Sequence, residues 1–274
     1  MIQGLKRLIV KFGTQNLMNG SGSLDQSIFD DYALQIYQLV NHGIEVVLVC
    51  SGAIQAGREA AHSVHLEPKR LHKKELAALG SARIMSHWQE AFDKTPCSIV
   101  TAQIPVTYAN WENEQERQSI KSSIIAFGAC GIVPIVNEND VVSQREIVLM
   151  EQGISENDRL ARMIAILIKA NAALFLTEFN GIYRGDPRVR PSAPHYAEIR
   201  AVATPDELGI TKGLSPRGNG GMAPKLVETS ICATKRGMRV AIAGNQEDVI
   251  LKFARGEQVG TLIGQKTILD HLIV

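Results

Sequence analysis

Short runs of branched apolar residues recur along this chain, and each ends abruptly at polar or small residues. One run, at residues 132 to 136, is followed directly by Asn137, Glu138, Asn139 and Asp140. Such runs are typical of strands buried on both faces of a parallel sheet. Comparable runs lie at 7 to 11, 44 to 50, 98 to 105, 172 to 176, 238 to 243 and 261 to 264. The pattern predicts an open, mainly parallel sheet whose carboxyl edge carries polar side chains, and such edges bind ligands.

Segments with helical character separate the apolar runs. Apolar residues recur at helical spacing in residues 25 to 42 and 73 to 92, and further helices are expected at 160 to 170 and up to residue 234. Strands that alternate with helices indicate a three-layer αβα sandwich with helices on both faces of the sheet. No flexible linker or internal repeat interrupts the chain. We therefore expect a single domain over residues 1 to 274, with a change of organisation near residue 170.

Composition narrows the classes of function. The chain has 274 residues, is 45% hydrophobic and carries a formal net charge of +1, which argues against nucleic acid or a membrane as its main partner. The cysteines are widely spaced and no histidine pair has metal-ligand spacing, so neither zinc nor disulfides are predicted. The amino terminus lacks the apolar core of a signal peptide, and no apolar run reaches membrane-spanning length. We expect a cytoplasmic protein.

Three junctions carry residues that suit a bound anion. Lys11 ends an apolar run just before Gly13, Ser51 is followed by two small residues at a predicted helix start, and the glycine-rich residues 218 to 225 end in Lys225. Helix-start N–H groups and a nearby ammonium bind phosphate oxygens. A lysine that extends into water is the plainer explanation of the first junction. The last junction lacks Walker spacing, and the serine lacks a G-x-S-x-G motif.

Two clusters of amides and acids, at 137 to 140 and at 155 to 158, follow further along the chain. Both could supply hydrogen-bond partners to an amino-acid-like substrate. Turn propensity alone also explains the first cluster, and helix capping also explains the second.

Taken together, these junctions resemble the amino acid kinase family. The motifs are V-K-F-G-T at 10 to 14, C-S-G-A-I at 50 to 54, V-N-E-N-D at 136 to 140, E-N-D at 156 to 158, L-T-E at 176 to 178, G-I-Y-R-G-D-P-R at 181 to 188 and G-G-M-x-x-K ending at Lys225. The resemblance covers essentially the whole chain and is strongest to the branch that phosphorylates glutamate. It implies the amino acid kinase fold, and transfer of a phosphoryl group from ATP, with Mg²⁺, to the side-chain carboxylate of L-glutamate in the first step of proline biosynthesis.

The resemblance also implies residue roles. The expected catalytic residues are Lys11, Lys225 and Asp158, with Asp158 orienting the two lysines. The expected substrate-binding residues are Ser51, Gly52, Ala53, Asn137, Asp140 and Asn157. The expected nucleotide-binding residues are Lys11, Gly13, Thr177, Glu178, Tyr183, Asp186, Asn219, Gly220, Gly221, Met222 and Lys225. Residues 1 to 170 form the implied substrate half and residues 171 to 274 the nucleotide half. No protein ligand to a metal is expected, since ATP phosphates and water carry magnesium.

The chemistry agrees with these roles. A glutamate carboxylate is already ionised at neutral pH and needs no general base. Phosphoryl transfer to it brings anions together, so cations and N–H donors must spread the charge.

Some positions depart from the family pattern. Glu178 stands where the family usually has Asp, and Asn219, Ala223 and Pro224 change a loop that is normally richer in hydroxyls. The usual substrate-lid pattern is not clearly matched at 112 to 121.

Two alternatives stay open. The same fold could act on another acceptor, such as aspartate, N-acetylglutamate or a nucleoside monophosphate, or the protein could sense glutamate, proline or nucleotide with little turnover. The resemblance further implies feedback inhibition by L-proline and a homodimer or homotetramer. We expect the kinase domain alone, without a PUA domain.

Overall fold

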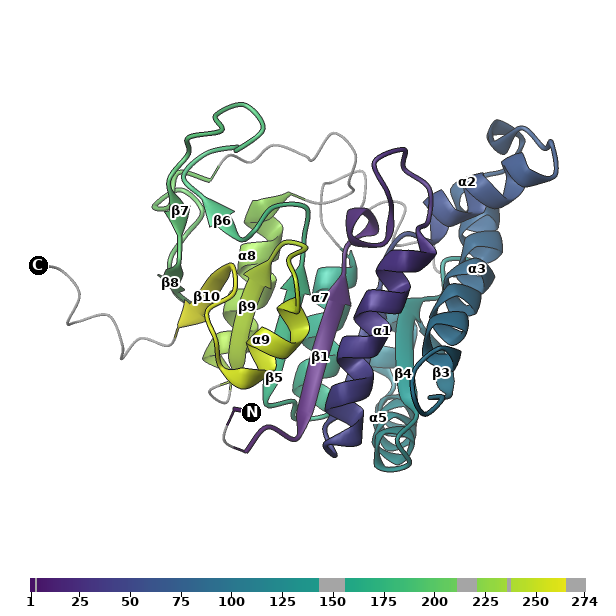
Figure 1. Cartoon of the computed structure of the whole chain (residues 1–274), viewed down its shortest axis with the longest axis horizontal. Coiled ribbons are helices and arrows are strands. Elements are labelled where there is room, and N and C mark those ends of the chain that lie inside the picture. Colours follow the sequence, from purple (N-terminus) through teal and green to yellow (C-terminus); the bar gives the residue numbers. More distant parts are fainter. Residues whose placement is uncertain (3, 143–155, 211–220, 236–237, 265–274) are drawn as a thin grey trace, which may run out of the picture. The chain divides into compact units, whose positions relative to one another are not determined.

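The computed structural model describes residues 1–2, 4–142, 156–210, 221–235 and 238–264. Its strands form an eight-stranded sheet in the order β3-β4-β2-β1-β5-β9-β10-β8, and β6 and β7 form a separate two-stranded sheet (Figure 1). Every pair with a described register in the large sheet is parallel except β9 with β10. The mainly parallel α/β fold predicted from the sequence is thereby confirmed.

The chain divides into two compact units. The N-terminal unit is Phe12–Val148, and the C-terminal unit combines Met1–Lys11 with Leu149–Val274. The expected change of function near residue 170 stays a prediction.

The N-terminal unit contains the parallel strands β2 (Glu45–Cys50), β3 (Thr101–Val106) and β4 (Val133–Glu138). Strands β2 and β4 are almost entirely buried, whereas β3, at the end of the sheet, is buried only at Val106. Val49 of β2 pairs with Val136 of β4. Helix α1 (Gln26–Asn41) lies on one face of these strands and α5 (Glu114–Ala129) on the other (Figure 1). The remaining helices are α2 (Ala53–Ser63), α3 (Lys73–Asp93) and α4 (Tyr108–Glu112), with short 3-10 turns η1 (Thr14–Leu17) and η2 (Pro68–Arg70).

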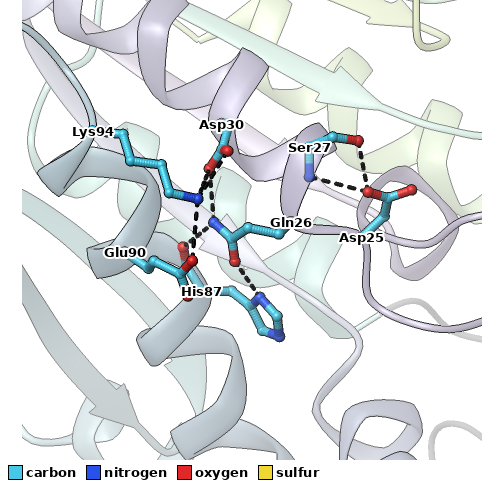
Figure 2. Close-up of polar contacts among 7 residues, drawn as sticks. All are labelled: Asp25, Gln26, Ser27, Asp30, His87, Glu90 and Lys94. Atoms are coloured by element: carbon cyan, nitrogen blue, oxygen red, sulfur yellow. Dashed lines mark hydrogen bonds and ion pairs between the residues drawn. The ribbon is translucent and has the colours of Figure 1, made fainter.

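An aromatic cluster holds α1 and α3 together. The ring centroids of Trp88 lie 5.1 Å from Phe12 and 5.0 Å from Phe29. Polar side chains of α1 and α3 also contact one another (Figure 2). Lys94 Nζ lies 3.0 Å from the carboxylate of Asp30, whose other oxygen accepts a hydrogen bond from Gln26 Nε2.

In the C-terminal unit, β5 (Ala172–Leu176) pairs in parallel with both β1 (Arg7–Phe12) and β9 (Arg239–Ala243). The sheet continues through β10 (Thr261–Gly264) to β8 (Glu198–Arg200). Helix α9 (Val249–Arg255) lies on one face, and α7 (Glu156–Leu167) and α8 (Met222–Thr234) lie on the other (Figure 1). The small sheet consists of β6 (Ile182–Tyr183) and β7 (His195–Tyr196).

The predicted strands and helices are observed, and the structure adds elements that the sequence pattern did not predict. Periodicity did not indicate α9 or the short strands β6 to β8. On the helix predicted at 73 to 92, Leu76, Ile84 and Trp88 are buried, whereas Leu79, which shares their helical spacing, is 43% exposed. None of the described helices is long and apolar enough to cross a bilayer.

Candidate active site

Three charged side chains meet inside the C-terminal unit. Lys11 Nζ lies 2.8 Å from Asp158 Oδ1, and Lys225 Nζ donates to both oxygens of the same carboxylate, at 2.8 Å each. Lys11 is 3% exposed, Asp158 is 0% exposed and Lys225 is 7% exposed. Charged groups are rarely buried to this degree unless they are paired, so this triad of Lys11, Asp158 and Lys225 is a candidate functional site.

Each residue of this triad lies near the end of a strand or a helix. Lys11 is the next-to-last residue of β1, Asp158 lies in the first turn of α7, and Lys225 lies in the first turn of α8. The first-turn N–H groups of a helix lack carbonyl partners within the helix, and its amino end carries a partial positive charge. Two helix amino ends therefore add to the positive potential that the lysines create.

The charges of the triad do not balance, because two ammonium groups share one carboxylate. Burial alone would raise the pKa of the Asp158 carboxyl, but Lys11 and Lys225 outweigh it and hold this pKa below its ordinary value. Burial lowers the pKa of Lys225, and the ammonium of Lys11 lowers it further, against the opposing effect of Asp158. A bound anion would relieve this excess of positive charge, so the triad is suited to phosphate.

Asn157, next to Asp158 on α7, carries an unused hydrogen-bond acceptor. The residue is 8% exposed, and among the described atoms its buried Oδ1 has no hydrogen-bond partner. Leaving a buried polar group unpaired costs about 1 to 3 kcal/mol. A ligand that donates a proton to this oxygen would remove that cost.

In the N-terminal unit, the ends of two chain segments bring Gly13, Ser51 and Gly52 together. The backbone N–H of Ser51 donates to Phe12 O at 3.1 Å. Gly52 has φ = +105°, and a Cβ built there would lie 3.6 Å from Thr14 Cγ2. Glycine adopts this left-handed conformation without strain, which allows the sharp turn from β2 into α2 at Ala53.

The backbone N–H of Gly13 already has a partner in the protein. It donates to Asn16 Oδ1 at 3.0 Å. A contact between Gly13 and nucleotide, which the resemblance implies, stays a prediction, and this particular donor is used by the chain itself.

Asn137 and Asp140 lie at the carboxyl end of β4. Because β2 and β4 are parallel and Val49 pairs with Val136, the residues after these two strands emerge at the same edge of the sheet as Ser51. Burial raises the pKa of the Asp140 carboxyl to about 6. The N-terminal unit thus gathers Ser51, Asn137 and Asp140 at one sheet edge, as their positions in the sequence indicated.

The expected nucleotide contacts on the C-terminal unit follow β5. The N–H of Thr177 donates to Ala243 O at 2.9 Å, which fixes the start of this segment. The guanidinium of Arg188 lies 2.8 Å from Asp186 and 4.0 Å from Glu178, and it stands 5.9 Å from the centre of the Phe179 ring. Arg188 therefore links two of the expected nucleotide-binding residues, a role that its place in the G-I-Y-R-G-D-P-R motif could have suggested.

Tyr183 contacts the opposite strand of the small sheet. Its ring centroid lies 5.0 Å from that of His195. Gly221 is the N-cap residue of α8 and Met222 its first residue. Asn219, Gly220 and the expected helix-start residue Ser155 lie outside the described residues.

Within the described part of the chain, no group of three or more His, Cys, Asp or Glu residues could hold a metal ion. The triad itself offers one carboxylate, already bonded to two ammonium groups.

The mainly parallel sheet and the buried Lys11–Asp158–Lys225 triad at two helix amino ends define a class: α/β proteins with a buried cluster of net positive charge where strand and helix ends meet. The amino acid kinase family model matches residues 6–244. The chain therefore belongs to the amino acid kinase family, a family of phosphotransferases.

Similar proteins agree with this membership. The chain is 36% identical over 257 residues to glutamate 5-kinase of Dehalococcoides mccartyi strain 195, covering 93% of this chain and 68% of that protein. It is 33% identical to glutamate 5-kinase of Geobacter sp. strain M21, covering 96% of this chain and 68% of that protein. Carbamate kinase from Giardia lamblia bound to AMP-PNP has a TM-score of 0.63 at 17% identity, over 96% of this chain and 100% of that one, which shows the shared fold.

Proposed function

We propose that this protein is an ATP-dependent glutamate 5-kinase. It transfers the γ-phosphoryl group of ATP to the side-chain carboxylate of L-glutamate, giving L-glutamyl 5-phosphate and ADP, the first step of proline biosynthesis from glutamate. The observation that supports this proposal best is the buried Lys11–Asp158–Lys225 triad, in which two cations share one anion. The named relatives supply the choice of glutamate as acceptor.

The proposed reaction needs charge stabilisation more than proton transfer. A carboxylate oxygen of glutamate attacks the γ-phosphorus, and the bond from that phosphorus to the β,γ-bridging oxygen breaks, so that ADP leaves with the electron pair. Negative charge spreads over the transferring group and the leaving oxygen. We assign Lys11 to the transferring phosphoryl group and Lys225 to the nucleotide phosphates.

Asp158 is assigned as the residue that holds both lysines in place. Two ammonium groups repel each other in a buried site, where charges interact strongly. A carboxylate that bonds both keeps them close without adding a proton donor or acceptor to the reaction. This positions the cations before substrate arrives, and such preorganisation is a large source of rate enhancement.

The other expected residues are assigned to the two substrates. Ser51, Asn137, Asp140 and Asn157 bind glutamate, with the Asp140 carboxylate and the unpaired Asn157 oxygen suited to its ammonium group. The remaining residues are assigned the nucleotide or substrate contacts that the resemblance implies. They are Gly13, Gly52, Ala53, Thr177, Glu178, Tyr183, Asp186, Asn219, Gly220, Gly221 and Met222.

ATP is the co-substrate expected of this family. Magnesium, when bound to the ATP phosphates, neutralises part of their charge. We propose that phosphate oxygens and water hold the ion, because the described residues offer no carboxylate cluster. Inhibition by L-proline, assembly into a dimer or tetramer and a cytoplasmic location stay predictions.

A panel of acceptors tests the proposed activity. The protein is incubated with ATP, Mg²⁺ and L-glutamate, L-aspartate, N-acetyl-L-glutamate or UMP, and ADP release is measured for each. With hydroxylamine present, an acyl phosphate is captured as a coloured hydroxamate. We expect hydroxamate and ADP in equal amounts with L-glutamate, and at least about a hundredfold lower kcat/KM with the others, because a site built for specific polar contacts rejects poor matches by such factors.

Other outcomes of this panel are equally informative. Preference for another acceptor would keep the family chemistry and refute glutamate as the substrate. Binding of ATP and glutamate in a calorimeter without any ADP release would indicate a sensor instead of an enzyme.

A further inference from the structure

Two ion pairs among the described residues join helices α7 and α8, and the first of them belongs to the triad. The second joins Arg162 Nε to the carboxylate of Glu228, whose side chains are 19% and 14% exposed, respectively. Neither residue lies in a motif that the sequence associates with substrate or nucleotide. The pair nevertheless connects the same two helices that carry Asp158 and Lys225.

The two ion pairs lie about one helical turn apart on both helices. Arg162 follows Asp158 by four residues on α7, and Glu228 follows Lys225 by three residues on α8. A helix rises about 1.5 Å per residue, so the second pair lies about 4.5 Å further along α8 and about 6 Å further along α7. Both steps run toward the carboxyl end, so a slide of α8 along α7 would stretch both pairs together.

Two other groups on α8 make contacts of a different kind. Thr229 Oγ1 bonds to Lys225 O at 2.9 Å, a contact within the helix itself, and Cys232 is an apolar neighbour with no exposed surface. Apolar packing tolerates small shifts along a helix axis better than a directional contact does. The planar guanidinium of arginine offers donors in a rigid arrangement that suits a carboxylate.

We propose that Arg162 and Glu228 are a positioning pair, which fixes the register of α8 against α7 and so keeps the Lys225 ammonium bonded to both oxygens of Asp158. The pair has no net charge, so it affects Lys225 by fixing the position of α8 and not by changing the charge of the site. Its effect on catalysis rests on the proposed function, whereas its effect on Lys225 itself does not.

Lysine labelling followed by mass spectrometry tests the position of Lys225 without reference to activity. The full chain and three variants are treated with an amine-acylating reagent, and the labelling rate of Lys225 is compared with that of Lys94, a surface lysine paired with Asp30. The variants are Glu228→Gln, the exchanged pair Arg162→Glu with Glu228→Arg, and Cys232→Ala. Burial raises the pKa of the Cys232 thiol to about 12, so the last variant removes packing volume and no charge.

We expect the Glu228→Gln variant to label Lys225 about tenfold faster, which is within the range of coupling between neighbouring charged groups. The exchanged pair should restore slow labelling, and the rate at Lys94 should not change. In the phosphoryl-transfer assay, Glu228→Gln should lower kcat about tenfold while KM for glutamate changes less than about twofold, because a misplaced cation impairs the reacting step. Cys232→Ala should lower the unfolding temperature and leave both readouts near wild type.

Unchanged Lys225 labelling in Glu228→Gln would overturn the proposal. So would the same labelling increase in Cys232→Ala, or an exchanged pair that has the circular dichroism of the wild type yet does not restore protection. If the labelling pattern holds but the wild type transfers no phosphoryl group, the proposed function fails and the positioning role stands.

Discussion

At the scale of single residues, Asp158 is the member of the triad on which the others depend. It is fully buried, and it bonds to two ammonium groups that are themselves almost entirely buried. Removing one partner of a buried ion pair is more damaging than replacing the whole pair, because an uncompensated charge remains in the interior. Here the loss of one carboxylate leaves two such charges.

We therefore expect Asp158→Asn to lower the free energy of unfolding by about 3 to 5 kcal/mol at pH 7. Burial lowers the pKa of Lys225, and in this variant the opposing effect of the Asp158 carboxylate is gone. Lys225 then binds its proton less tightly in the folded than in the unfolded chain, so the unfolded state holds more protons and stability rises with pH. Urea denaturation at pH 7 and pH 9 measures both effects. A variant as stable as wild type at pH 7, with no gain at pH 9, would contradict this account of the triad.

The titration of Asp140, in the N-terminal unit, predicts a second, separate pH dependence. Its pKa is raised to about 6 by burial, so the carboxyl is protonated and neutral below that pH. If Asp140 binds the ammonium of glutamate, only its ionised form does so. We expect kcat/KM for glutamate to fall as pH decreases through about 6, with a smaller change in KM for ATP.

The matched variant for this profile is Asp140→Asn. Its residual kcat/KM should be lower than that of the wild type at pH 7 and above, should approach it in acid, and should lack the decline near pH 6. A decline that persists in this variant would assign the titration to another group and remove the support for Asp140 as the ammonium-binding residue.

At the scale of elements, the crossing of α2 and α3 determines where the Ser51–Gly52–Ala53 turn lies. The helices approach closely at two glycines. A Cβ on Gly80 would lie 1.8 Å from Ala53 O, and one on Gly57 would lie 1.8 Å from Leu76 O. Both distances are far below van der Waals contact with backbone atoms, so a larger residue must push the helices apart. Ala53 is the first residue of α2, so a displacement at Gly80 reaches the Ser51–Gly52–Ala53 turn directly.

Gly80→Ala should therefore destabilise the protein by about 1 to 3 kcal/mol, as overpacked cores do, and should raise KM for glutamate. Gly20→Ala is the control, because a Cβ there meets no atom within 4 Å. Thermal unfolding and steady-state kinetics on both variants check the prediction. Equal behaviour of the two variants would show that the crossing does not position the turn.

The junction of α1 and α3 should respond to acid. His87 stacks on Phe29 with centroids 5.1 Å apart and contacts Gln26 through Nδ1 (Figure 2). Burial lowers the pKa of His87. The folded state then binds fewer protons than the unfolded state once the pH falls below the ordinary histidine pKa of about 6.5, so stability is lost on acidification. The difference in unfolding free energy between wild type and His87→Asn should change in this direction from pH 7.5 to pH 5.5; a constant difference would contradict it.

At the scale of the whole molecule, the sequence predicted element boundaries best where an apolar pattern stops at a polar residue. The strand at Ala172–Leu176 and the end of the helix at Thr234 were predicted to the residue, because an apolar run and a helical pattern both stop at polar residues. That Lys11, Asp158 and Lys225 meet could not follow from their spacing, since 147 residues separate the first two and 67 the last two. The family resemblance supplied that expectation.

Other features depend on tertiary contacts that no local pattern reports. The antiparallel pairing of β9 with β10 requires knowledge of how the chain returns to the sheet. Arg162 and Glu228 each look like ordinary polar positions on an amphipathic helix, and only the packing of α7 on α8 makes them a pair. Leu79 fits the apolar spacing of its helix, yet nothing covers enough of it to bury it.

We propose that the two ammonium groups on Asp158 stabilise the charge of phosphoryl transfer, Lys11 at the transferring group and Lys225 at the nucleotide phosphates. Single-turnover transfer of labelled phosphoryl from γ-³²P-ATP to L-glutamate measures this step directly, in wild type, Lys11→Met, Lys225→Met and the surface control Lys94→Met. We predict transfer in the wild type and the control, and rates at least about a hundredfold lower in the two triad variants, in line with the loss of a preorganised charge. Transfer at the wild-type rate in either triad variant, with the fold intact, would contradict the claim.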